Sequence, residues 1–133
     1  MIFSDKIKDK QAYIRNLVDY IANRRITIEV CLTSNLQTTP SIKDIKSHSL
    51  RRMLDEQLSL TFCTDNRLVS HTTVTDEYLL ATQNFDISPK QLRDIVLYGF
   101  KRSFSPLHYK DNRNYVRKVR DLLDKQLAAK DNS

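Results

Sequence analysis

The chain has 133 residues, and its 22 Lys and Arg against 16 Asp and Glu give a formal net charge of +6. This length suffices for one domain with a core but not for a complete eight-stranded α/β barrel, which needs roughly 200 residues or more. The mild basic excess is spread along the chain and does not by itself indicate nucleic-acid binding. Since no apolar run approaches the ~20 residues of a membrane span and no signal peptide is evident, we expect a cytoplasmic chain without membrane contact.

The first half of the chain predicts a helix, a strand, a short helix and a second strand. The first helix ends at residues 23–25 and carries an apolar stripe at helical spacing: Ile14, Leu17, Val18 and Ile21. Residues 26–32 are apolar apart from Thr27 and Glu29, which is typical of a strand buried on both faces. Residues 33–47 predict a polar loop, a short helix around Leu50 follows, and residues 58–63 predict the second strand. A strand–helix–strand unit implies parallel strands with a right-handed crossover.

The second half predicts three helices. The first starts at residues 73–76 and presents Val74, Tyr78, Ala81 and Phe85 on one face. The second starts with a capping box, in which Ser88 is the N-cap, Pro89 is N1 and Gln91 is N3. The third runs from about Asn112 with the stripe Val116, Val119, Leu123 and Leu127. Because two parallel strands do not form a stable sheet alone, we expect them to belong to something larger. A small helical domain with a two-stranded element is the alternative.

The basic and sulfur-containing side chains do not indicate a functional site strongly. The densest basic stretch, which comprises Arg113, Arg117, Lys118 and Arg120, is interleaved with aspartates and predicts a solvated helix face rather than a phosphate-binding patch. Cys31 and Cys63 each lie in an apolar strand-like run, so we expect buried free thiols and no disulfide framework.

One carboxylate stands out by its place in the chain. Asp65 follows the second predicted strand and therefore lies at the carboxyl end, where α/β folds bind ligands. By pattern alone, Asp65 could equally cap a turn with the Thr72–Thr73 segment.

Several segments together resemble the adenosine deaminase family. Residues 29–38 read Glu-Val-Cys-Leu-Thr-Ser-Asn-Leu-Gln-Thr, and the family has the same segment with Pro in place of Leu32. Residues 64–66, Thr-Asp-Asn, are similar to the Thr-Asp-Asp of the family's last barrel strand. His48 falls where the family often has a His-Pro pair, and Glu77-Tyr78 and Ser103-Phe104 resemble the Glu-Tyr and Ser-Phe of its later helices. The resemblance runs in order over residues 26–104.

The resemblance implies a fold, an activity and site residues. The fold would be α/β, the C-terminal part of a TIM-type (β/α)8 barrel with two parallel strands plus about five helices, and residues 1–133 would form one partial domain that begins after the sixth-strand His. The family deaminates adenosine to inosine and ammonia with a hydroxide on zinc, which lowers the pKa of bound water. Asp65 looks like the catalytic aspartate that is also a zinc ligand. Asn66 stands where many members have an Asp that binds purine N7, and its amide can donate to that acceptor.

The other zinc ligands of the family, a His-X-His pair and a further His, are missing from this chain. We interpret His48 as a capping or packing residue, and His71 and His108 as loop residues. The zinc deaminases with a Pro-Cys-X-X-Cys motif are excluded, since Cys31 and Cys63 lie far apart in the sequence. One ligand does not hold zinc, because protein zinc sites use three or four.

The main hypothesis is therefore a C-terminal fragment of an adenosine deaminase-like zinc aminohydrolase that is inactive alone. Its partners would be adenosine or a related purine nucleoside and the missing N-terminal half-barrel, without nucleic acid or membrane. The alternative is a non-catalytic remnant or an association module with an open sheet edge. A basic module that binds nucleic acid is weaker, because no clustered basic face is predicted.

Overall fold

The computed structural model describes residues 8–131, which form seven α-helices, one 3-10 helix and two β-strands. In chain order the elements are α1 (Lys10–Asn23), β1 (Ile28–Val30), α2 (Leu32–Thr38), η1 (Ile45–Ser47), α3 (Leu50–Asp55), β2 (Leu60–Phe62), α4 (Arg67–Ser70), α5 (Val74–Asn84), α6 (Pro89–Lys101) and α7 (Tyr109–Asp131). The prediction of about five helices is therefore too low, because it missed α2 and α4.

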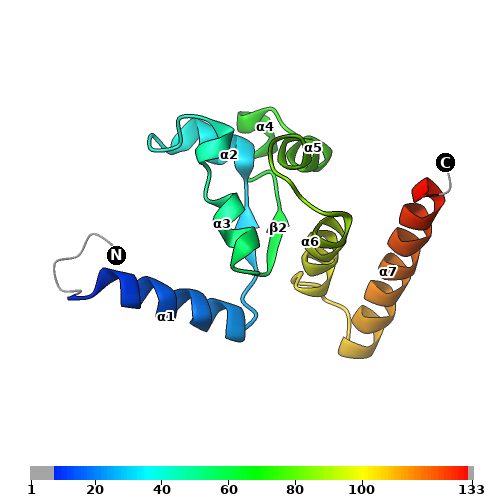
Figure 1. Cartoon of the computed structure of the whole chain (residues 1–133). Helices are drawn as coiled ribbons and strands as arrows, with labels where there is room; N and C mark the ends of the chain where they lie inside the picture. Colours follow the sequence, from blue (N-terminus) through cyan, green and yellow to red (C-terminus); the bar gives the residue numbers. More distant parts are fainter. Residues whose placement is uncertain (1–7, 132–133) are drawn as a thin grey trace.

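The two strands are parallel, as predicted. Ile28 pairs with Leu60 and Val30 with Phe62, and beyond this pair the Cys63 N–H donates to the Val30 carbonyl at 3.0 Å. Both strands are shorter than predicted, and residues 32–38 form a helix rather than the end of the first strand and a loop. Parallel strands end at the same edge of their sheet, so the segments that follow β1 and β2 lie together, and Figure 1 shows α2 and α4 at that end.

The core gathers around the strand pair. Val30, Leu60 and Phe62 are buried with apolar side chains of the surrounding helices: Leu32, Leu50, Leu54, Ala81, Phe85 and Ile95. The ring of Phe62 meets that of Tyr78 edge-on at 5.0 Å. The prediction that the first strand is buried on both faces is wrong for this chain, because Glu29 is exposed.

Helix α6 approaches β2 closely at Gly99, the single glycine of the sequence. A Cβ placed on Gly99 would lie 2.7 Å from Thr61 Oγ1. Glycine costs about 1 kcal/mol relative to alanine inside a helix. The presence of Gly99 in the last turn of α6 is explained by the close contact with β2, which leaves no room for a Cβ.

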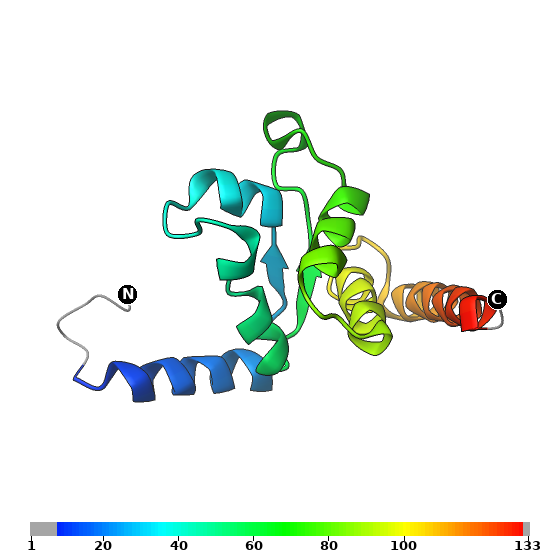
Figure 2. The ribbon, with the colours of Figure 1, turned by 45° about the horizontal axis from the view of Figure 1, so that its top comes forward.

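The first and last helices extend away from this body. Figures 1 and 2 show α1 projecting from this body. It buries none of its residues, so its predicted apolar stripe is only partly covered. Helix α7 packs on α6 through the rings of Phe100 and Tyr115, whose centroids are 5.8 Å apart, and through the ion pair of Arg93 with Asp124. Among the helices that the structure describes, none has the length and apolar character to cross a membrane.

Candidate functional site

The polar site at the carboxyl end of the sheet is built from the segments that follow both strands. Asp65, three residues after β2, exposes its side chain, and its Oδ2 accepts a hydrogen bond of 2.8 Å from the hydroxyl of Ser34. Ser34 is buried in α2, which follows β1 directly. The carboxylate at the end of one strand is thus oriented by a hydroxyl at the end of the other. Its second oxygen, Oδ1, accepts no hydrogen bond from the residues that the structure describes.

The backbone of Asp65 adopts the left-handed conformation, with φ of 53°. This region costs an ordinary residue roughly 1–2 kcal/mol, and aspartate and asparagine tolerate it best after glycine. Strained residues cluster at functional sites, where the surrounding structure holds them. The alternative in which Asp65 caps the Thr72–Thr73 segment is not observed, since its carboxylate accepts a hydrogen bond from the Ser34 hydroxyl instead.

Asn66 caps the short helix α4. Its side-chain Oδ1 accepts from the Val69 N–H at 3.2 Å. Because an N–H needs an acceptor, this bond fixes which end of the amide is oxygen. The Nδ2 group of the exposed Asn66 donates no hydrogen bond to the other residues that the structure describes.

A buried carboxylate that sequence reasoning missed supports this edge of the sheet. Glu77 on α5 is fully buried, and it accepts from the Thr33 N–H at 3.3 Å and from the Thr72 hydroxyl at 3.1 Å. Thr33 lies in the first turn of α2, so Glu77 satisfies a helix N-terminal donor next to Ser34. The signal in the sequence was only the resemblance of Glu77-Tyr78 to a family motif, which gave no role.

His48 is confirmed as a capping and packing residue. It is buried, its Nδ1 accepts from the Leu50 N–H at 3.0 Å, and its Nε2 lies 3.1 Å from Asn35 Oδ1. An unprotonated Nδ1 requires the proton on Nε2, which donates to Asn35. Burial lowers the pKa of His48, which favours this neutral form.

The other two histidines do not join the site. His71 is exposed at the end of α4 with φ of 49°, and His108 is exposed before α7. Within residues 8–131, no group of three His, Cys, Asp or Glu side chains is arranged to hold a metal ion. Asp65 and Asn66 are therefore brought together without the further ligands that zinc requires.

The two cysteines are free, as predicted, but each is only partly buried. Their Sγ atoms lie 3.0 Å apart, just beyond the last paired residues of the two strands. Burial raises the pKa of the Cys63 thiol to about 12, with a further rise from the neighbouring Cys31.

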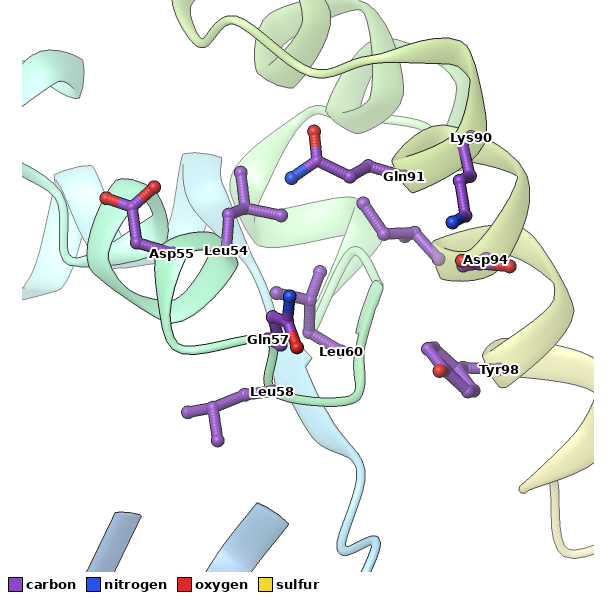
Figure 3. Close-up of a pocket in the computed structure, with 10 residues that line it drawn as sticks. Leu54, Asp55, Gln57, Leu58, Leu60, Lys90, Gln91, Asp94 and Tyr98 are labelled. Atoms are coloured by element: carbon purple, nitrogen blue, oxygen red, sulfur yellow. The ribbon is translucent and has the colours of Figure 1, made fainter. Parts of the chain in front are cut away.

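A groove between α3 and α6 has a different character (Figure 3). Leu54 and Leu60 form its apolar wall, and Lys90, Asp94 and Tyr98 of α6 line the opposite side. Neither Asp65 nor Asn66 lines it, so the polar site lies outside this hollow.

Comparison with known proteins assigns the chain. The sequence model of a family described as adenosine deaminase matches residues 5–122. The chain belongs to the adenosine deaminase family. The match includes Asp65, Asn66 and the α2 segment that holds Ser34.

Similar family members are longer than this chain. It is 29% identical over 96 residues to the adenosine deaminase of Clostridium acetobutylicum, covering 72% of this chain and 28% of the relative. It is 36% identical over 88 residues to an adenosine deaminase of Vibrio cholerae, covering 66% and 26%. The chain thus spans little more than a quarter of these relatives.

The fold also matches a solved structure. The crystal structure of Arabidopsis ADAL complexed with IMP superposes with a TM-score of 0.67 at 21% identity, covering 85% of this chain and 37% of that one. The mostly helical fold with two parallel strands therefore matches part of the fold of that structure.

Proposed function

We propose that this chain supplies Asp65 and Asn66 to the metal and purine site of an adenosine deaminase-like aminohydrolase. The substrate would be adenosine or a related purine nucleoside. The observation that carries the proposal is the exposed carboxylate of Asp65 at the carboxyl end of β2, oriented by Ser34 from the end of β1.

The chemistry of Asp65 suits a role as an oxygen ligand. Carboxylate oxygens bind zinc at protein sites, and Ser34 occupies one oxygen of Asp65 while the other stays open. A single carboxylate does not fit zinc by itself. The proposal therefore makes the fragment one contributor to a site whose further ligands come from the part of the fold that corresponds to the rest of its relatives.

Asn66 would bind the purine through a hydrogen bond. Its Oδ1 is engaged by α4, so Nδ2 is the group that it offers, and purine N7 is an acceptor. The related Arabidopsis structure is complexed with IMP, a purine nucleotide, which supports a purine as the ligand. The same proposal makes residues 1–133 the C-terminal part of a barrel. It also makes zinc the metal of the complete enzyme.

The test is complementation. The chain is coexpressed with the part of the Clostridium acetobutylicum relative that precedes the matched region, and the two are purified through a tag on one of them. We expect conversion of adenosine to inosine by the zinc-loaded pair and none by the chain alone. Asp65→Ala should lower the turnover by at least about 100-fold while the pair still forms, and Asn66→Ala should raise KM.

The matched control is Asp86→Asn, which changes an exposed carboxylate outside the site. It should leave turnover unchanged. A pair that forms stably but shows no deamination, or a pair in which Asp65→Ala is as active as the parent, would contradict the proposal.

The second candidate is a non-catalytic association module. It is favoured by the exposed apolar side chains of α1, Leu17 and Tyr20, and by a sheet of only two strands. Light scattering distinguishes it: concentration-dependent association of the chain would support this candidate, and a monomer with one sharp thermal transition would count against it.

A further inference from the structure

Cys31 and Cys63 occupy equivalent positions on neighbouring strands. The last paired residues are Val30 and Phe62, and each cysteine follows one of them. The hydrogen bond from the Cys63 N–H to the Val30 carbonyl, 3.0 Å long, continues the ladder at this point and fixes the register. The two side chains meet with their Sγ atoms 3.0 Å apart.

The short distance between the two sulfurs is compatible with a covalent bond. Neighbouring strands lie about 4.7–4.9 Å apart, and disulfide-bonded cysteines have Cα atoms about 4.4–6.8 Å apart. An S–S bond is about 2.05 Å long, so closure needs the sulfurs to approach by only about 1 Å. Both side chains are partly exposed, so a small reagent can reach them.

We propose that Cys31 and Cys63 are a site of reversible covalent modification, at which a low-molecular-weight disulfide of the glutathione class converts the thiol pair to an intramolecular disulfide. One cysteine sulfur attacks the reagent and forms a mixed disulfide, releasing one glutathione. The second cysteine attacks the protein sulfur of that mixed disulfide, forms the Cys31–Cys63 bond and releases the second glutathione. The reagent takes up the two electrons, and the two thiol protons end on the released glutathione molecules.

The new disulfide would constrain both segments that form the polar site. Cys31 immediately precedes α2, which carries Ser34, and the Asp65 N–H donates to the Cys63 sulfur. The new bond joins the two segments that hold the hydroxyl and the carboxylate. The proposal stands on the positions of the cysteines and does not depend on the proposed function.

The experiment treats the reduced full chain with glutathione disulfide, then blocks remaining thiols and measures the intact mass. We expect a species that has lost two hydrogens and takes up no blocking reagent. After trypsin cleavage, residues 26–43 should be linked to residues 53–67, since each peptide holds one cysteine and no internal Lys or Arg. Dithiothreitol should return the parent mass.

Two controls isolate the role of the fold. Cys31→Ser and Cys63→Ser each leave one thiol, and both variants should yield only the mixed disulfide with glutathione. In urea the chain brings the cysteines together only by chance, so the ratio of internal to mixed disulfide should fall at least about tenfold.

Several outcomes overturn the proposal. They are mixed disulfides on both cysteines of the folded chain without an internal bond, linkage only between chains, and an internal bond that forms as readily in urea as in the folded state. An internal bond accompanied by loss of the circular dichroism signal would also overturn it, because closure would then need unfolding rather than an approach of about 1 Å.

Discussion

Replacing Gly99 by alanine tests how closely α6 approaches β2. In an isolated helix the change would be stabilising, because glycine costs about 1 kcal/mol relative to alanine. Here the new Cβ would lie 2.7 Å from Thr61 Oγ1, a distance at which one of the groups must move. Threonine is stiff at χ1, so the hydroxyl does not swing away freely.

The two effects oppose each other, and the magnitude decides the sign. Overpacking a close contact costs typically about 1–3 kcal/mol. After subtraction of the gain in helix propensity, we expect Gly99→Ala to lower the free energy of unfolding by up to about 2 kcal/mol.

The assay is a double-mutant cycle measured by urea unfolding. Thr61→Ala removes the hydroxyl that obstructs the new Cβ, so in that background Gly99→Ala should stabilise the chain by up to about 1 kcal/mol. The coupling between the two sites should be about 1–3 kcal/mol. Thr61→Ala also removes a hydrogen bond to Tyr78, but the cycle cancels this cost.

The reasoning would be refuted if Gly99→Ala stabilised the chain equally with and without the Thr61 hydroxyl. Zero coupling would mean that α6 stands further from β2 than the structure has it, and that the glycine is there for another reason.

Three other predictions concern buried and capping groups. Glu77→Ala leaves two donors unsatisfied and should lower the free energy of unfolding, measured in urea, by about 2–4 kcal/mol. Glu77→Gln keeps an acceptor and should lower it less. Equal losses in the two variants would argue against the hydrogen bonds from Thr33 and Thr72. Burial lowers the pKa of His48 below 6.5, so as the pH falls the unfolded chain binds a proton at this residue before the folded chain does. The free energy of unfolding should therefore decline below pH 6.5. His48→Gln should flatten that part of the pH profile, and an unchanged slope would contradict the assignment. Ser88→Ala removes the N-cap bond to the Gln91 N–H and should lower the free energy of unfolding by about 1 kcal/mol; no change in the urea midpoint would mean that the cap contributes nothing.

The elements that local chemistry determines could be predicted from the sequence. The Ser88–Gln91 capping box begins α6 as expected, and both reciprocal hydrogen bonds are present. The parallel pairing of the strands also followed, because a helix separates two apolar runs. The capping box depends on residues three positions apart, whereas the parallel direction of the strands follows from the order of the elements along the chain.

The elements that were missed depend on distant partners. Residues 32–38 hold no strong periodic pattern, and α2 receives support at its first turn from Glu77, which lies 44 residues after Thr33. Helix α4 is only four residues long and was not predicted, and Asn66, which caps it, was interpreted only as a substrate-binding residue. The sequence placed Asp65 at a strand end, yet the bond from Ser34 required the strand register, which no local pattern contains.

The left-handed backbone at Asp65 has a consequence for mutational tolerance. At φ of 53°, glycine and asparagine fit as readily as aspartate, whereas β-branched residues are strongly disfavoured. A saturation library at this position, selected only for folding, should therefore retain Gly, Asn and Asp together. Selection for a carboxylate function would keep Asp alone, so the ratio of Asp to Asn among survivors separates the demands of conformation from those of chemistry.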